Sequence, residues 1–425
     1  MEHRFRIGAA VLAAAGLAAA DMSEKEEIQL GQSAAPSIEY QMGGELADPA
    51  LAGYFASVCR KVVAQGDRPG LPWTFRVLNT SDVNAFALPG GPTYITRGLL
   101  VRLRSEHQMA AVMGHETAHV ARRHGVKQMD RASGFENLLK VVELAGAATG
   151  HEKETRIAGQ VGGTALGLAL NGYGREQEEE ADKLGALYAA KSGYDPRGMA
   201  GTLSILLSIE KESDAPRMPA FLSDHPRTKD RIKTVNRYIA RNWPAVEADY
   251  QAGKFVTREA EFNAAVAGLR GVHASYLVYD RAVAALDRGD VRAAAAGAAE
   301  ALAKHPQQAP FLVLRGRVRI ETGDTRGAAA DFAEAARIDP ACVDARLATG
   351  ILLVGAGRPA EAEEHLTWVV ARLPDLPEAQ FYLAEAYLGQ RKTGQARHHY
   401  RAVLDLTDQP PWAGRARDRL LEIGN

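Results

Sequence analysis

The sequence predicts an α+β protein that is mostly α-helical, with a small β-sheet in its N-terminal domain and an all-α solenoid after it. Three observations support this prediction. Runs of aromatic and β-branched residues at 73–78 and 93–96 are typical of short strands. A helical pattern begins at Ser105, where Gln108 completes a capping-box signature. The C-terminal third repeats every 34 residues, which indicates stacked supersecondary units.

The composition is that of ordinary globular domains and excludes one class of partner. The chain has 425 residues, which suggests two or three domains at about 150 residues each. It is 46% hydrophobic and 24% charged, so sizeable cores can be buried. Lys plus Arg total 51 and Asp plus Glu total 52. Because the chain lacks the positive field that a phosphate backbone attracts, we expect no nucleic-acid partner.

Residues 1–20 are predicted to be a cleavable signal peptide. Arg4 and Arg6 precede the apolar run 7–20, which ends in three alanines, the small residues that a signal peptidase requires. As a helix this run reaches only about 21 Å, short of a hydrocarbon core of about 30 Å. Cleavage after export is therefore favoured over a retained membrane anchor.

The chain has two cysteines, Cys59 and Cys342. An exported protein permits a disulfide between them. However, Cys59 shares a helical face with Phe55 and Val62, so a buried free thiol is the favoured interpretation.

The 34-residue period is visible in several residue types at once. Prolines and glycines recur in register, and so do pairs of small residues: Pro306, Pro340 and Pro374; Gly289, Gly323 and Gly357, with Arg391 in the fourth place; Ala282, Gly316, Gly350 and Ala384; Ala294, Ala328, Ala362 and Ala396. Small residues let two helices approach, Gly makes the turn between them, and Pro ends the second helix. This unit resembles the tetratricopeptide repeat. We expect four repeats and a capping helix at 412–423, within a domain at 272–425.

A candidate metal motif lies on the predicted helix from Ser105 to His124, for which Gly125 is the expected stop. His115 and His119 are four residues apart, so both imidazoles lie on one helical face and can bind one ion. Glu116 lies beside them and can accept a proton from water. His124 lies five residues beyond His119, off that face, and is interpreted as a helix-end cation.

A catalytic zinc site needs a third protein ligand and one open position. The acidic helical block at 175–182 offers Glu178 and Asp182, which share a face. Glu178 is the predicted third ligand. Asp182 is predicted to accept the other ring N–H of a ligand histidine. The neighbouring acids Glu176, Glu179 and Glu180 are expected to form a solvated surface.

Four blocks in order give the chain a specific resemblance: 84–91 with 94–100, the His115–His119 motif, 175–182, and Asp224-His225-Pro226 with Arg231. Over about residues 22–240 the sequence is similar to the HtpX-type gluzincin metallopeptidases, a family that includes the CAAX prenyl proteases and the mitochondrial Oma-type enzymes. The resemblance implies a zincin-type domain, here expected at 21–260, with one Zn²⁺ per chain. Among its subfamilies, the similarity is greatest to exported proteases that carry tetratricopeptide repeats.

The family also implies roles for particular residues. His115, His119 and Glu178 correspond to its zinc ligands, Glu116 to its general base and Asp182 to the acid behind the ligands. An edge strand that binds substrate corresponds to Phe86, Ala87 and Leu88, or else to 94–96. His225 corresponds to a histidine that occupies the water position and keeps the enzyme latent. Arg231 is expected to help stabilise the oxyanion.

The resemblance implies a zinc endopeptidase of the periplasm that degrades misfolded or misassembled envelope proteins. Its repeats would bind clients or a protein partner such as outer-membrane assembly machinery, with chaperone-like activity. The alternative is an adaptor or holdase with a latent or vestigial peptidase. The interval 138–170 is expected to form a helical hairpin over the active site, and contact with a membrane surface stays open.

Overall fold

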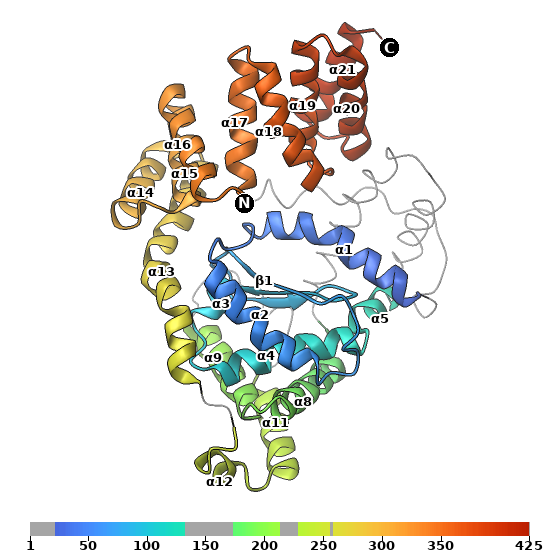
Figure 1. The fold of residues 1–425 in the computed structure, drawn as a ribbon, viewed down its shortest axis with the longest axis vertical. Coiled ribbons are helices and arrows are strands. Elements are labelled where there is room, and N and C mark those ends of the chain that lie inside the picture. Colours follow the sequence, from blue (N-terminus) through green and yellow to red (C-terminus); the bar gives the residue numbers. More distant parts are fainter. Residues whose placement is uncertain (1–21, 132–172, 213–227, 256–257, 425) are drawn as a thin grey trace. The chain divides into compact units, whose positions relative to one another are not determined.

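The computed structural model of the chain describes residues 22–131, 173–212, 228–255 and 258–424. The described residues fall into two compact units that divide between Gly271 and Val272. The predicted signal peptide, the interval 138–170 and His225 lie outside the described residues, and the expectations for them stay predictions. Helices dominate both units, as the sequence predicts (Figure 1).

The first unit contains the small β-sheet. Its strands are β1 (Thr74–Leu78), β2 (Ala85–Ala87) and β3 (Pro92–Thr96), in the order β1-β3-β2. β1 pairs with β3 in parallel, and β2 pairs with β3 in antiparallel register. The two strands predicted from residue type are thus present, and β2 includes Phe86 and Ala87, which the family resemblance implied as part of an edge strand. β3 is paired on both sides, which excludes its residues 94–96 as the edge strand.

Nine helices of this unit surround the sheet or extend from it: α1 (Glu24–Gln41), α2 (Pro49–Val63), α3 (Arg97–Leu100), α4 (Glu106–Ala121), α5 (His124–Arg131), α8 (Arg175–Lys191), α9 (Gly198–Glu212), α11 (Thr228–Asn242) and α12 (Val246–Gln251), counted over the described residues. α13 (Glu259–Asp287) begins in this unit and continues without a break into the second.

Helix α4 starts where the sequence predicts and ends earlier. The Ser105 hydroxyl accepts a hydrogen bond from the Gln108 N–H at 3.3 Å, which caps the helix. The helix ends at Ala121, and Arg123 adopts the left-handed conformation with φ 54°. The expected stop at Gly125 is wrong, because the chain has already turned at Arg123 and Gly125 lies within α5.

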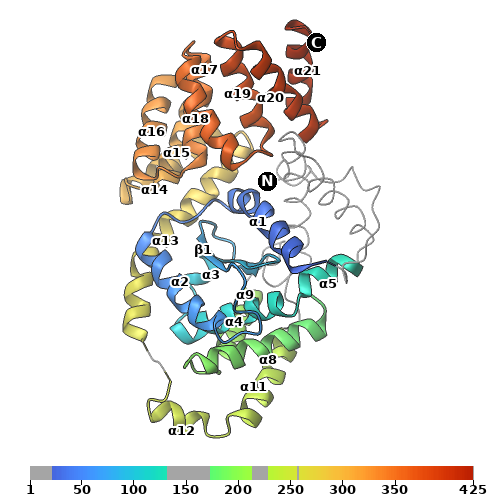
Figure 2. The ribbon, with the colours of Figure 1, turned by 45° about the vertical axis from the view of Figure 1, so that its right-hand side comes forward.

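Helices α4 and α8 lie side by side (Figures 1 and 2). Gly114 and Gly185 allow their backbones to touch. A Cβ added at Gly114 would lie 2.6 Å from the Gly185 carbonyl oxygen, and one at Gly185 would lie 2.6 Å from the His115 backbone nitrogen. This contact brings the acidic face of α8 against the histidine face of α4.

The second unit is the predicted repeat array. The C-terminal part of α13 packs against α14 (Val291–Lys304) in one buried cluster. Three further pairs and a last helix follow: α15 (Ala309–Glu321) with α16 (Thr325–Ile338), α17 (Val343–Gly355) with α18 (Pro359–Arg372), α19 (Pro377–Gly389) with α20 (Thr393–Leu406), then α21 (Trp412–Glu422). The turn residues Gly289, Gly323 and Gly357 have φ of 79°, 83° and 70°. Arg391, in the fourth place, has φ 62°, so the turn geometry persists without the glycine.

Small residues form the contacts within each pair of helices. Ala294, Ala328, Ala362 and Ala396 are all fully buried. A Cβ added at Gly316 would lie 2.4 Å from the Phe332 ring, and one at Gly350 would lie 2.6 Å from the Leu366 side chain. The positions that define the period are therefore the positions where the helices meet.

Two further expectations can be compared with the described residues. Cys59 and Cys342 are both free, and Cys59 is buried, as the sequence favoured. Among the helices that the structure describes, none has the length and apolar character needed to cross a membrane.

Candidate metal centre

His115, His119 and Glu178 gather into one buried cluster between α4 and α8. The Nε2 atoms of the two histidines lie 3.0 Å apart. The Glu178 carboxylate lies 3.4 Å from His119 Nε2 through Oε1 and 3.7 Å from His115 Nε2 through Oε2. The three side chains are each at most 3% exposed. The spacing of four residues and the packing of α8 thus bring the three predicted ligands together.

The donor set of this cluster fits a zinc ion. One ligand atom from each of the three residues lies within 4.8 Å of the others, and both ring nitrogens face the same point. Two imidazoles and one carboxylate are the ligand types of a catalytic zinc site that keeps a position open.

Asp182 lies behind His115, one helical turn along α8 from Glu178. Its Oδ1 is 3.0 Å from His115 Nδ1, the ring nitrogen that faces away from the cluster. Burial alone would raise the pKa of Asp182, but the Arg231 guanidinium and His115 outweigh burial and lower that pKa to about 2. An ionised Asp182 accepts the His115 Nδ1–H and leaves Nε2 free for a metal.

Arg231, on α11, binds both acidic residues of this site. Its Nε donates to Asp182 at 2.8 Å, one terminal nitrogen donates to Asp182 at 2.7 Å, and the other contacts Glu178 at 2.7 Å. Burial would lower the pKa of Arg231, but the carboxylates of Asp182, Glu178 and Glu116 raise it. Arg231 is 3% exposed. The guanidinium orients two carboxylates here, and its expected contact with an oxyanion stays a prediction.

Glu116 lies in the same buried region, next to the first ligand in the chain. It is 1% exposed, and its carboxylate is among the charges that act on Arg231. Its assignment as general base stays a prediction.

His124 corrects one expectation from the sequence. Its Nδ1 lies 3.0 Å from His119 Nδ1, and its Nε2 lies 3.3 Å from Glu180. Burial lowers the pKa of His124 to about 4, so the ring is neutral at pH 7 and is not a helix-end cation. Glu180, expected on a solvated surface, is half-exposed yet contacts both His124 and Arg122.

Sequence reasoning missed this contact because it assumed an unbroken helix. Five residues along an ideal helix place a side chain about 140° away from its starting face. The left-handed Arg123 ends α4 and turns the chain, so the first residue of α5 returns over His119. An Arg at such a position gives no signal, since Gly or Asn is the usual residue there.

β2 lies beside α4 and is the edge strand that remains from the two sequence alternatives. Phe86, Ala87 and Leu88 are 3%, 7% and 0% exposed, and the Phe86 ring packs on Tyr94 with centroids 4.9 Å apart. Pairing of a substrate strand along β2 stays a prediction, and it requires the outer edge of β2 to become accessible.

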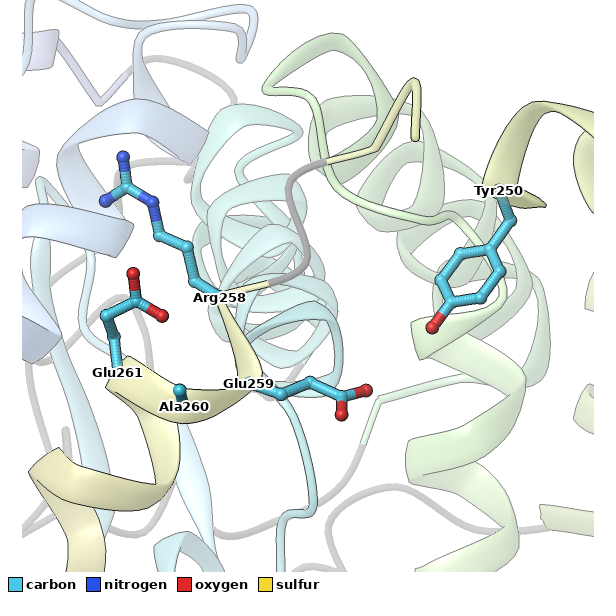
Figure 3. Close-up of a pocket in the computed structure, with 5 residues that line it drawn as sticks. All are labelled: Tyr250, Arg258, Glu259, Ala260 and Glu261. Carbon is cyan, nitrogen blue, oxygen red and sulfur yellow. The ribbon is translucent and has the colours of Figure 1, made fainter. Parts of the chain in front are cut away.

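One surface hollow of about 450 Å³ lies elsewhere in this unit (Figure 3). It is lined by Tyr250 and by residues 258–261 at the start of α13, and Glu259 points toward the Tyr250 ring. None of its lining residues belongs to the metal cluster. The hollow is therefore separate from the candidate site.

Comparison with known proteins places both units. Residues 49–239 match the model of Peptidase family M48, and residues 279–343 and 347–411 match a tetratricopeptide repeat model. The first match contains every described residue of the metal centre. The second confirms the repeats predicted from the 34-residue period.

Curated relatives match part of the chain. The beta-barrel assembly-enhancing protease of Escherichia coli (strain K12) is 29% identical over 203 residues, which cover 47% of this chain and 41% of the relative. The mitochondrial metalloendopeptidase OMA1 of Schizosaccharomyces pombe is 29% identical over 188 residues, 44% of this chain and 52% of the relative. The human mitochondrial metalloendopeptidase OMA1 is 27% identical over 191 residues, 43% of this chain and 36% of the relative.

The matched segments thus span about half or less of each relative's length. They confirm the family resemblance predicted from the four sequence blocks. The chain therefore combines a segment at residues 49–239 that matches Peptidase family M48 with a C-terminal array of tetratricopeptide repeats.

Proposed function

We propose that the chain is a zinc-dependent endopeptidase whose repeats recruit its protein substrates or a protein partner. The observation that supports the activity most directly is the buried cluster of His115, His119 and Glu178, with Glu116 next to it in the chain. The names of the curated relatives, which are proteases and metalloendopeptidases, support the same activity.

In this proposal each residue has a defined task. His115, His119 and Glu178 hold the ion, and Asp182 fixes the first histidine in the tautomer that leaves Nε2 unprotonated. When bound, the ion supplies Lewis acidity toward water and the scissile carbonyl. Glu116 accepts the proton of the attacking water and passes it to the leaving amine. The burial of the cluster strengthens these interactions because little water competes with them.

The substrate and the location are proposed from the relatives and the sequence. Among the relatives are beta-barrel assembly-enhancing proteases, which supports misassembled envelope proteins as substrates. The apolar run at residues 7–20 supports export to the periplasm. The repeat array supports docking of a protein, since stacked helix pairs expose an extended surface. Binding near the peptidase would raise the local concentration of substrate, and chaperone-like holding would follow from the same surface.

The first experiment is digestion of unfolded casein by the zinc-loaded chain and by Glu116→Gln. The variant removes the proton acceptor and keeps the size of the side chain. We expect the rate to fall by about 10²–10⁴-fold with zinc content unchanged. Glu176→Gln is the matched control, because it removes the same charge from an exposed position on α8 and should cleave like the wild type.

Equal cleavage by wild type and Glu116→Gln would reject Glu116 as the base. Absence of cleavage by both, with zinc bound and aggregation of a client suppressed, would instead support the adaptor or holdase.

A further inference from the structure

The two ligand histidines are supported in different ways. His115 lies one helical turn before His119, in the interior of α4. The Asp182 carboxylate lies 3.0 Å from His115 Nδ1. His119 lies in the last turn of α4, four residues before Arg123, which adopts the left-handed conformation. Residues in a last helical turn have fewer backbone hydrogen bonds to fix them. His119 therefore needs a restraint from outside its own helix.

Three side chains supply that restraint. His124 Nδ1 lies 3.0 Å from His119 Nδ1, and His124 is only 1% exposed. The Tyr173 ring stacks on the His119 ring, with centroids 3.8 Å apart and planes inclined by 21°. Glu180 lies 3.3 Å from His124 Nε2, and its other oxygen is 3.0 Å from Arg122 Nε. These contacts form a continuous series from His119 through His124 to Glu180 at the surface.

The direction of the protons follows from the ligand role. If His119 binds a metal through Nε2, its ring proton is on Nδ1 and must be donated. The nearest acceptor is His124 Nδ1, so the proton of the neutral His124 ring is on Nε2, from where it is donated to Glu180. Only this pair of tautomers satisfies both contacts and leaves His119 Nε2 without a proton.

We propose that His124 is a positioning residue that orients His119 for the metal, with Glu180 fixing the tautomer of His124. The proposal rests on the ligand assignment of the proposed function and adds a second support, made of His124 and Glu180, to the one that Asp182 gives His115. The backbone agrees with this role. The left-handed conformation of Arg123 is unfavourable for a residue with a side chain, and the Arg123 guanidinium is held by an ion pair to Glu27 at 3.0 Å.

The test measures zinc affinity by competition with a chelator, which is independent of proteolysis. His124→Leu removes the acceptor, and we expect affinity to fall by about 10–100-fold. His124→Asn places an amide oxygen near the former Nδ1, so it should restore affinity to within about threefold of the wild type. A purely structural role would give no such rescue. Glu179→Ala, which removes a charge from α8 at a surface ion pair with Arg175, is the control and should bind like the wild type.

A second measurement uses the cobalt-loaded protein. Its visible absorption reports ligand geometry, so His124→Leu should alter the spectrum while His124→Asn preserves it. If His124→Leu loses its circular dichroism signal, Glu180→Ala replaces it as the test, because Glu180 is 46% exposed and its loss leaves the core intact. We expect Glu180→Ala to weaken zinc binding by at least about threefold.

Unchanged affinity in folded His124→Leu or Glu180→Ala would overturn the positioning role. So would an Asn variant as weak as the Leu variant. A wild-type chain that binds no zinc would refute the proposed function itself, which is a separate and distinguishable outcome.

Discussion

In both units a glycine allows two helices to approach closely, but the group that contacts the glycine differs. In the first unit, Gly114 and Gly185 let the backbones of α4 and α8 touch, so neither surface can adjust. In the repeat unit, Gly316 and Gly350 accept the side chains of Phe332 and Leu366, which can change rotamer. The metal centre thus depends on a rigid contact, and the repeats depend on one that tolerates change.

The units also differ in how they bury charge. Arg231 lies at 3% exposure between Asp182 and Glu178. In the repeats, Asp331 is buried but has two arginine partners, Arg315 and Arg319, each of which is partly exposed. Removing one partner should therefore be costly in the first unit and tolerated in the second.

The largest effect is expected from the pair of variants Arg231→Met and Arg315→Met. Arg231→Met deprives the buried carboxylates of Asp182 and Glu178 of their shared guanidinium, so the free energy of unfolding should fall by about 3–5 kcal/mol. Arg315→Met should cost less than about 1 kcal/mol, because Arg319 still pairs with Asp331 at 2.7 Å. Urea denaturation followed by circular dichroism measures both. Equal losses would contradict the comparison of buried charge.

A smaller difference is expected between Gly185→Ala and Gly316→Ala. The new methyl group in Gly185→Ala meets the His115 backbone and should cost about 3 kcal/mol, while in Gly316→Ala it meets a ring that can move and should cost about 1 kcal/mol. The gain in helix propensity from Gly to Ala is similar in both and cancels. Thermal unfolding gives the difference, and zinc affinity should fall only in Gly185→Ala. A Gly316→Ala chain as unstable as Gly185→Ala would remove the distinction between the two contacts.

The smallest effect concerns pH in the repeat unit. Burial, followed by the charge of His398, lowers the pKa of His399 to about 4. The unfolded chain then binds a proton more readily than the folded one, so this stabilisation is complete above pH 6.5 and declines as pH falls toward 4. Between pH 7 and 4.5 we expect a loss of about 2 kcal/mol that is absent in His399→Gln. Identical pH dependence of unfolding in the two proteins would show that His399 does not titrate with folding.

Much of the repeat unit could be predicted from the sequence because its contacts are local. Each small residue contacts a side chain about 16 residues away in the same 34-residue repeat, as Gly316 contacts Phe332. The same contact then recurs in the next repeat. The periodic Gly, Ala and Pro positions therefore predict where the helices of each repeat pack and where they turn. The turn at Arg391 shows the limit of this rule, since the geometry survives there without its usual residue.

The metal centre was predicted in part. The sequence by itself predicted that His115 and His119 share one helical face and that Glu178 and Asp182 share another, because residues four apart lie on the same side of a helix. It also determined the 34-residue repeats. Only the tertiary structure decided that His124 supports His119 and that Arg231 binds both acids of α8. These contacts depend on a backbone turn at Arg123 and on a helix 49 residues beyond Asp182, and no periodic pattern encodes either.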